Sequence, residues 1–183
     1  MKRLTLVIIG IVLVLGFAIW FSQHRGLSAD KTGNMTSAAH PEDATYRING
    51  KDVTLVNGQN ETAIEGSASK IITRVWSGEP QFGDLNGDGI NDAVIIIIQE
   101  TSGSGIFFYV AAALKNQTTG GYNGTDAYVL GDRIAPQNFS ISKGIIEVNY
   151  ADREPWQPMT TPPSVGATTY LHVVNGAVVA SEQ

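Results

Sequence analysis

Residues 84–100 read DLNGDGINDAVIIIIQE, and the two halves of this stretch predict very different local structures. In the second half, residues 93–98 are apolar and, apart from Ala93, β-branched. β-Branched side chains favour strands, and a short, uninterrupted apolar run predicts a buried strand rather than a helix. The first half is rich in Asp, Asn and Gly, which predicts a tight loop leading directly into that strand.

The loop carries oxygen-bearing side chains at a regular spacing. They stand at loop positions 1, 3, 5 and 9, and Gly89 at position 6 permits a sharp turn. A calcium ion takes six to eight oxygen ligands, and alternate side chains of a curled loop converge on such an ion. The sequence therefore predicts one Ca²⁺ site with these ligands: Asp84, Asn86, Asp88, Asp92 and the backbone carbonyl of Ile90.

The loop differs from an EF-hand at its twelfth position, where Ile95 stands in place of the usual bidentate glutamate. Over about a dozen residues, the DxNxDGxxD spacing before a strand resembles the calcium loops of FG-GAP and VCBS repeats. Loss of the twelfth carboxylate predicts weak binding, with a dissociation constant of about 10⁻⁴–10⁻³ M. The alternative interpretation is a turn without metal, because Asp, Asn and Gly also favour turns.

The N-terminus predicts a membrane segment. Residues 4–21 carry no charge, and 18 residues at about 1.5 Å rise span roughly 27 Å, close to the hydrocarbon thickness of a bilayer. Lys2 and Arg3 precede the segment, which predicts a cytoplasmic N-terminus and an extracytoplasmic C-terminal domain. We expect an uncleaved signal anchor in the cell membrane, with a cleaved secretory signal as the alternative.

The exported part is acidic and free of cysteine. Without Lys2 and Arg3, the 12 basic residues of the chain fall to 10, which leaves a formal charge of −7 against 17 acidic residues. This charge disfavours nucleic acid and anionic lipid as partners. Because there are no disulfides and no thiolates, we expect the domain to be stabilised by its core or by a metal ion.

Turn signals divide the rest of the sequence into short strands. Asn49-Gly50, Lys143-Gly144 and Asn175-Gly176 are expected to be hairpin turns. Residues 120–124 are expected to form a glycine-rich loop, and four prolines interrupt residues 155–163. About nine or ten strands in 139 residues predict a mainly β fold, a single antiparallel sandwich or open-barrel domain behind one N-terminal transmembrane helix.

These signals divide the chain into four parts. They are a cytoplasmic stub of residues 1–3, a transmembrane signal anchor of residues 4–21, a flexible spacer of residues 22–44 and an extracytoplasmic β domain of residues 45–183. The spacer is assigned because its sequence is polar and has no hydrophobic periodicity.

A wider resemblance covers most of residues 46–183. Its motifs are GDLNGDGINDAV, GSGIFFYVAAAL, LGDRIAPQ and VNYADREPWQPM, and they resemble an uncharacterised bacterial envelope domain found behind single anchors or signal peptides. The resemblance implies an exported bacterial protein and supplies no catalytic mechanism. Members often carry cysteines after the segment matching residues 159–162, where this chain has none, so no disulfide or metal role is carried over there.

Charged residues near the C-terminus suggest an alternative function. Asp132, Arg133 and Asp152, with Trp156 close to the last of them, are candidates for an envelope enzyme acting on glycan or peptide. A structural ion pair and an exposed charged loop are the simpler interpretations. Without a convincing His, Cys or paired-carboxylate centre, hydrolysis has little support, and no catalytic residue is assigned.

The sequence therefore predicts a membrane-anchored extracytoplasmic calcium-binding module rather than an enzyme. Its role would be binding or structural in the cell envelope, with the membrane, and an envelope protein or glycan, as partners. A purely structural component of a surface assembly is a third interpretation, which an exposed sheet edge or a flat apolar patch would favour.

Overall fold

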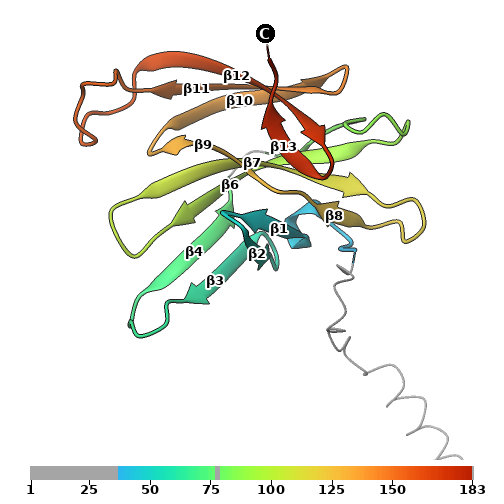
Figure 1. Ribbon diagram of the computed structural model, residues 1–183, viewed down its shortest axis with the longest axis horizontal. Helices are drawn as coiled ribbons and strands as arrows, with labels where there is room; N and C mark the ends of the chain where they lie inside the picture. The colour runs from blue at the N-terminus through green and yellow to red at the C-terminus, as the bar shows by residue number, and fades with distance from the viewer. Residues whose placement is uncertain (1–36, 77–78, 183) are drawn as a thin grey trace, which may run out of the picture. The chain divides into compact units, whose positions relative to one another are not determined.

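The structure is a computed structural model that describes residues 37–76 and 79–182. These described residues are mainly β, with 57% of them in strands and 2% helical, and one sheet curls into an open half-barrel (Figure 1). This confirms the mainly β prediction. The expected stub of residues 1–3 and transmembrane segment of residues 4–21 lie outside the described residues. Within the described ranges, no helix is long and apolar enough to cross a membrane.

Thirteen strands are described, and a short 3₁₀ helix, η1 (Pro41–Asp43), precedes them. The strands are β1 (Thr45–Ile48), β2 (Lys51–Thr54), β3 (Gln59–Ala63), β4 (Lys70–Val75), β5 (Gln81–Gly83), β6 (Asp92–Glu100), β7 (Ile106–Lys115), β8 (Tyr122–Gly124), β9 (Tyr128–Asp132), β10 (Ala135–Ser142), β11 (Ile145–Asp152), β12 (Val165–Val174) and β13 (Ala177–Ala180). All pairings between these strands are antiparallel.

The strands form three groups. A seven-stranded sheet has the order β3-β4-β6-β7-β8, in which β5 also pairs with β6 and β9 also pairs with β7. A four-stranded sheet has the order β10-β11-β12-β13, and β1 and β2 form a separate hairpin. Figure 1 shows the four-stranded sheet on one side of β6 and β7, with the β1–β2 hairpin on the other.

The burial of strand β6 on both faces explains the unbroken apolar run at residues 93–98. All its side chains from residue 92 to residue 99 are buried. Successive side chains of a strand point to opposite faces. The even-numbered residues from 94 to 98 pack in a core with the four-stranded sheet, and the odd-numbered residues from 93 to 97 pack in a second core with β1 and β2. One strand therefore joins two hydrophobic cores.

Residues before residue 45 already contact the β domain. The N–H of Ala38 donates to the carbonyl of Tyr122 at 2.9 Å and the N–H of Tyr122 returns a bond of 2.6 Å to Ala38. Ala44 is buried against β6 and β7. Residues 37–44, which fall in the expected spacer of residues 22–44, thus contact the β domain, while the rest of that spacer lies outside the described residues.

Candidate functional site

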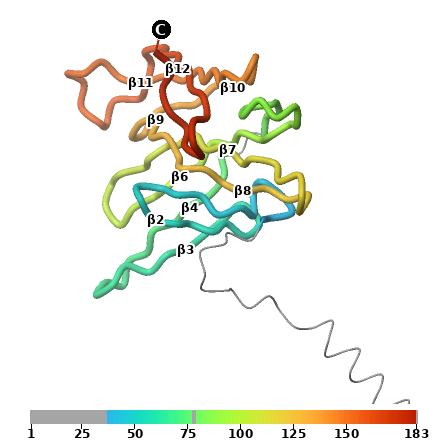
Figure 2. The backbone as a smooth tube through the Cα atoms, turned by 45° about the vertical axis from the view of Figure 1, so that its right-hand side comes forward, coloured from blue at the N-terminus to red at the C-terminus, as the bar shows by residue number. Residues whose placement is uncertain are grey.

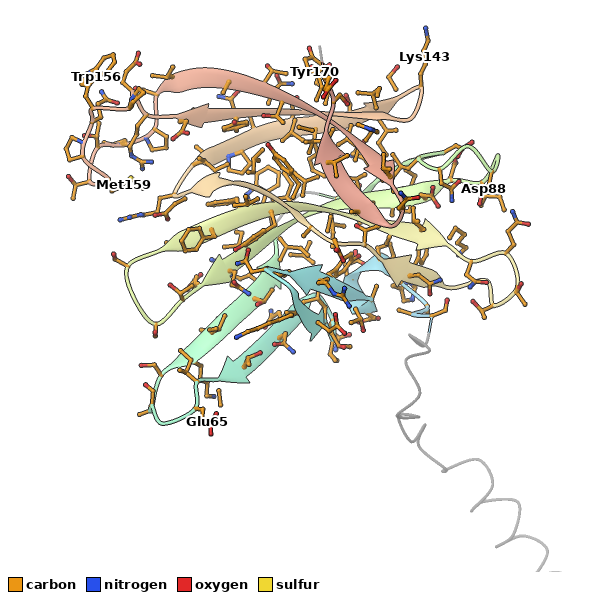
Figure 3. The ribbon with its side chains drawn as sticks, viewed as in Figure 1. Glu65, Asp88, Lys143, Trp156, Met159 and Tyr170 are labelled. Atoms are coloured by element: carbon orange, nitrogen blue, oxygen red, sulfur yellow. The ribbon has the colours of Figure 1, made fainter. Side chains whose placement is uncertain are left out.

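The candidate calcium loop joins β5 to β6, so it has a strand on each side. Gly87 and Gly89 have φ angles of 80° and 81°, in the left-handed region that residues with a Cβ avoid. These two glycines allow the loop to curl tightly. Figure 3 shows Asp88 at the exposed edge of the molecule.

Asp84 organises the inside of the loop. Its Oδ1 accepts a hydrogen bond from the N–H of Gly87 at 2.7 Å, and its Oδ2 accepts one from the N–H of Gly89 at 2.9 Å. The Gly89 amide has the largest effect on the Asp84 carboxyl and, with the other loop amides, lowers its pKa although burial acts in the opposite direction. Asp84 therefore stays ionised, and each oxygen keeps a lone pair for a further ligand.

Asn86 and Asp88 lie further along the loop and are exposed. Each accepts a bond from the backbone amide two residues later, as Asx turns do: Asp88 N–H to Asn86 Oδ1 at 2.9 Å, and Ile90 N–H to Asp88 Oδ1 at 2.9 Å. The Asn86 amide also donates to Asp88 Oδ2 at 3.2 Å. The predicted role of the Ile90 carbonyl as a ligand stays a prediction.

Asp92 differs from the other three acidic or amide side chains because it is fully buried, with 0% exposure. Its Oδ2 accepts from the N–H of Leu85 at 3.0 Å, and its Oδ1 accepts from the N–H of Lys115 at 2.8 Å. Burial raises the pKa of Asp92, and the charges of Asp88 and Asp84 raise it further against the lowering effect of the two amides. Asp92 thereby ties the loop to the end of β7.

The geometry separates the predicted ligands into two sets. Asp84, Asn86 and Asp88 belong to the curled loop, whereas Asp92 is directed inward. In residues 37–76 and 79–182, no three His, Cys, Asp or Glu side chains lie together closely enough to hold a metal ion. The donor chemistry itself fits calcium, because every predicted ligand atom is an oxygen.

A cavity of about 540 Å³ adjoins the loop. The loop contributes one wall, and the β10–β11 turn and β12 contribute the other, including Lys143 and His172. His172 is half-buried, and its Nδ1 lies 3.0 Å from the hydroxyl of Ser181, as a structural histidine would. The full lining consists of Gly83, Asp84, Leu85, Gly87, Ile141, Lys143, Gly144, His172 and Val173.

The charged residues of the enzyme alternative meet at a different place in the fold. Asp132 Oδ1 accepts from the N–H of Ile106 at 2.9 Å, and Asp132 Oδ2 accepts from Nη2 of Arg133 at 3.0 Å. Burial would raise the pKa of Asp132, but the hydrogen bonds from Arg133 and Ile106, with the charges of Arg133 and Arg153, together lower it. These contacts are those of a structural ion pair that is held in the ionised state.

Arg153 links this pair to the connection between β11 and β12. Its Nη2 donates to the carbonyl of Arg133 at 2.9 Å, its Nε donates to the carbonyl of Thr161, and its side chain is only 7% exposed. Its Nη1 has no hydrogen-bond partner among the described residues and lies 3.9 Å from Asp152 Oδ1. Arg153 therefore connects the Asp132–Arg133 pair with Asp152, a role that sequence reasoning did not assign to it.

The proline-rich connection that Arg153 holds carries two exposed apolar side chains. Trp156 is 78% exposed and Met159 is 40% exposed. Figure 3 shows both at one end of the molecule, with Asp88 at the other. Trp156 is therefore not a core residue, and it is too far from the candidate calcium loop to belong to the same site.

Comparison with known proteins does not add a family: no protein-family model, no curated protein and no solved structure matches this chain. The functional argument therefore depends on the residues and contacts described above.

Proposed function

We propose that this chain is an extracytoplasmic calcium-binding module with a binding or structural role in the cell envelope. The observation that carries the proposal is the state of Asp92. This carboxylate is fully buried, and it has no ion pair among the described residues. Two further negative charges, on Asp84 and Asp88, act on it. A buried carboxylate near like charges is costly unless a cation offsets them.

Calcium is the cation that suits this loop. Its ligands would be Asp84, Asn86, Asp88, the Ile90 carbonyl and Asp92, all of which offer oxygen. Mg²⁺ demands a smaller octahedral cage and gives up its water reluctantly, so it should compete poorly for a flexible loop. The exposure of Asn86 and Asp88 leaves room for water or for a partner's oxygen in the coordination shell.

The proposed role of the ion is to stabilise one end of the seven-stranded sheet. Asp92 is the first residue of β6 and bonds to the last residue of β7, Lys115. Neutralising the loop would therefore strengthen the junction of the two most buried strands. Binding to the folded state alone at a calcium concentration ten times the dissociation constant contributes about 1.4 kcal/mol.

The enzyme alternative gains no specific support from the described contacts. Asp132 and Arg133 are committed to each other, and Asp152 Oδ1 accepts the backbone N–H of Arg153 at 2.7 Å. We therefore carry the binding module forward and retain an envelope protein or a glycan as its proposed partner.

Calorimetric titration of the full-length chain in a non-ionic detergent tests the calcium site. We expect one ion with a dissociation constant of about 10⁻⁴–10⁻³ M. Between chelator and 10 mM calcium, the melting temperature should rise by about 3–10 °C, and 10 mM magnesium should produce much less. An unchanged melting temperature and no binding heat in calcium would leave the loop as a turn without metal.

The proposed location has a separate test. The uncharged residues 4–21 behind Lys2 and Arg3 support a membrane anchor with the β domain outside the cytoplasm. Protease added to intact cells should cut within residues 22–36 and release the folded domain. Full protection of the C-terminal part would contradict this topology without affecting the calcium proposal.

A further inference from the structure

Strands β2 and β3 start as a hairpin and then separate. The turn between them contains Asn57 and Gly58, with φ angles of 51° and 76°. Val56 and Gln59 close this turn with two backbone hydrogen bonds, of 2.8 Å and 3.2 Å. Beyond this one rung, and within the part of the chain that the structure describes, β2 pairs only with β1 and β3 pairs only with β4. Figure 2 shows the β1–β2 and β3–β4 hairpins diverging from this region.

The register shows which residue pairs of β2 and β3 would be hydrogen-bonded if the hairpin continued. A hairpin closed by Val56 and Gln59 would next place Thr54 opposite Glu61 and Asp52 opposite Ala63. Neither pair is formed in the structure. The cleft therefore begins where an ordinary hairpin would have continued.

Asn60 stands at the point where the two strands part. Its side-chain amide donates to the carbonyl of Thr54 at 2.9 Å, and its Oδ1 accepts from the hydroxyl of Thr62 at 2.8 Å. A side chain thus takes the acceptor that the amide of Glu61 would otherwise use. This contact stabilises the open arrangement of β2 and β3.

The wall formed by β2 presents backbone groups that the sheet does not use. In the β1–β2 hairpin, Arg47 lies opposite Asp52. The backbone of Arg47 makes its hydrogen bonds on the side away from β2: its N–H donates to the carbonyl of Thr125, and its carbonyl accepts from the N–H of Ala127. Arg47 and Asp52 thus form a non-hydrogen-bonded pair, in which both residues direct their N–H and C=O away from each other. Asp52 therefore points its backbone groups into the cleft. By alternation, Thr54 directs its backbone groups to the same side, but its carbonyl already accepts the hydrogen bond from the Asn60 side chain.

The wall formed by β3 follows the same rule. The backbone of Gln59 bonds to Val56, away from β4. Alternation along an antiparallel strand then directs the N–H and C=O groups of Glu61 and Ala63 away from β4, and Ala63 is one of the residues that line the cleft. Both walls therefore offer donors and acceptors at strand spacing.

Between these walls lies a cavity of about 520 Å³ with a partly apolar floor. Val53 and Ile71 contribute apolar surface, and the charged lining residues are Lys51, Asp52 and Glu65. Asp52 pairs with Arg47 at 3.1 Å, and the remaining charges of Lys51 and Glu65 are of opposite sign, so the lining favours neither a polyanion nor a polycation. The full lining consists of Ile48, Asn49, Lys51, Asp52, Val53, Thr62, Ala63, Ile64, Glu65, Ile71, Gln99 and Thr101.

We propose that this cleft binds an extended peptide segment of a partner protein, which inserts as a strand between β2 and β3. Addition of a strand to free sheet edges derives its affinity from main-chain hydrogen bonds, and its specificity from pockets for alternate side chains. Since β2 and β3 run in opposite directions, the inserted strand is antiparallel to one wall and parallel to the other. Its small apolar side chains face the floor, and its polar ones face solvent.

The proposal does not depend on calcium. The cleft is formed by β2, β3 and the ends of β4 and β6, and none of the predicted calcium ligands lines it. It adds a peptide-binding site to the proposed envelope module and gives the class of partner that the module would hold. Failure of the calcium experiment would leave the proposal intact, and the reverse also holds.

The test uses the ¹⁵N-labelled full-length chain in detergent micelles and the capped peptide KTVTVTK, which alternates small apolar and hydroxyl side chains. We expect the amide signals of Asp52, Glu61 and Ala63 to shift on titration to 1 mM peptide and to exchange with solvent at least tenfold more slowly. The same peptide with N-methylated backbone amides retains its side chains but loses its donors, so it should bind at least tenfold more weakly.

Two variants at one residue separate backbone from side-chain recognition. Glu61→Ala removes the carboxylate but retains the N–H, so peptide affinity should stay within about twofold. Glu61→Pro removes the N–H that points away from β4 while leaving the bonds to β4, because proline is tolerated on edge strands. Its affinity should fall at least tenfold, with circular dichroism confirming the fold.

Three outcomes would overturn the proposal. The first is an absence of amide shifts at 1 mM peptide, and the second is equal binding of the normal and N-methylated peptides, which remains decisive even if Glu61→Pro misfolds. The third is slow exchange of the Asp52 and Glu61 amides in the free protein at all concentrations. That result would mean that β2 and β3 close on each other.

Discussion

Nη2 of Arg153 donates a 2.9 Å hydrogen bond to the carbonyl of Arg133, which joins two connections that lie 20 residues apart in the chain. The same guanidinium donates to the carbonyl of Thr161. One buried side chain therefore holds the β9–β10 connection and the proline-rich β11–β12 connection together. The loop that carries the exposed Trp156 is fixed from its base.

Replacement of Arg153 should be costly. Arg153→Ala leaves the carbonyls of Arg133 and Thr161 without their donor in a largely buried place, so we expect a loss of about 2–4 kcal/mol of unfolding free energy. Arg47→Ala is the matched control, since its side chain is 53% exposed and its solvated ion pairs with Asp52 and Asp126 should contribute little to stability. Urea unfolding measures both, and equal losses would contradict a special role for Arg153.

Asp132 gives the protein an acid-sensitive contact. The pKa of its carboxyl is lowered in the folded state, so its contribution to stability is present above the unfolded pKa of about 3.9 and is lost as pH falls through the folded value. Asp132→Asn should therefore destabilise the protein by about 1–3 kcal/mol at pH 7. The difference from the wild type should shrink below about pH 4. Thermal unfolding between pH 3 and pH 7 measures this, and a difference that is constant with pH would contradict it.

Asp88→Ala tests the ligand assignment in the calcium loop. The change removes one predicted ligand, and it also removes a negative charge that acts on buried Asp92. The melting temperature should lose its dependence on calcium, while the protein in chelator should melt within about 2 °C of the wild type. Glu65→Ala, at the opposite end of the molecule in Figure 3, removes the same charge and should preserve the calcium response. Retained calcium dependence in Asp88→Ala would exclude this residue as a ligand.

Local sequence signals predicted the turns and the central strands well. Asn49-Gly50, Lys143-Gly144 and Asn175-Gly176 all adopt positive φ angles between strands, as hairpin turns of this composition do. The apolar run at residues 93–98 is buried on both faces of β6. These features depend on residues close together in the chain, so a single sequence contains them.

Elements that depend on distant neighbours were not predicted. Strand β3 reads QNETA, with no apolar periodicity, and forms because β4 supplies its hydrogen bonds. Residues 120–124 were expected to be a loop, and this was wrong for β8 (Tyr122–Gly124), which pairs with β7. The inward direction of Asp92 was likewise missed, because its partner Lys115 lies 23 residues away and is placed by the β6–β7 register.

Gly124 in β8 shows how such a distant neighbour restricts the sequence. A Cβ at this position would approach the ring of Tyr46 to 2.7 Å and would collide with the carbonyl of Thr45, so the backbone of β1 would have to move. Gly124→Ala should therefore cost about 1–3 kcal/mol or more, as overpacking of a core does. Gly103→Ala is the control, because a Cβ there meets nothing within 4 Å and its φ is not positive. In urea unfolding, the control should lie within about 0.5 kcal/mol of the wild type. Equal stability of the two variants would mean that β1 does not approach β8 as closely as the structure shows.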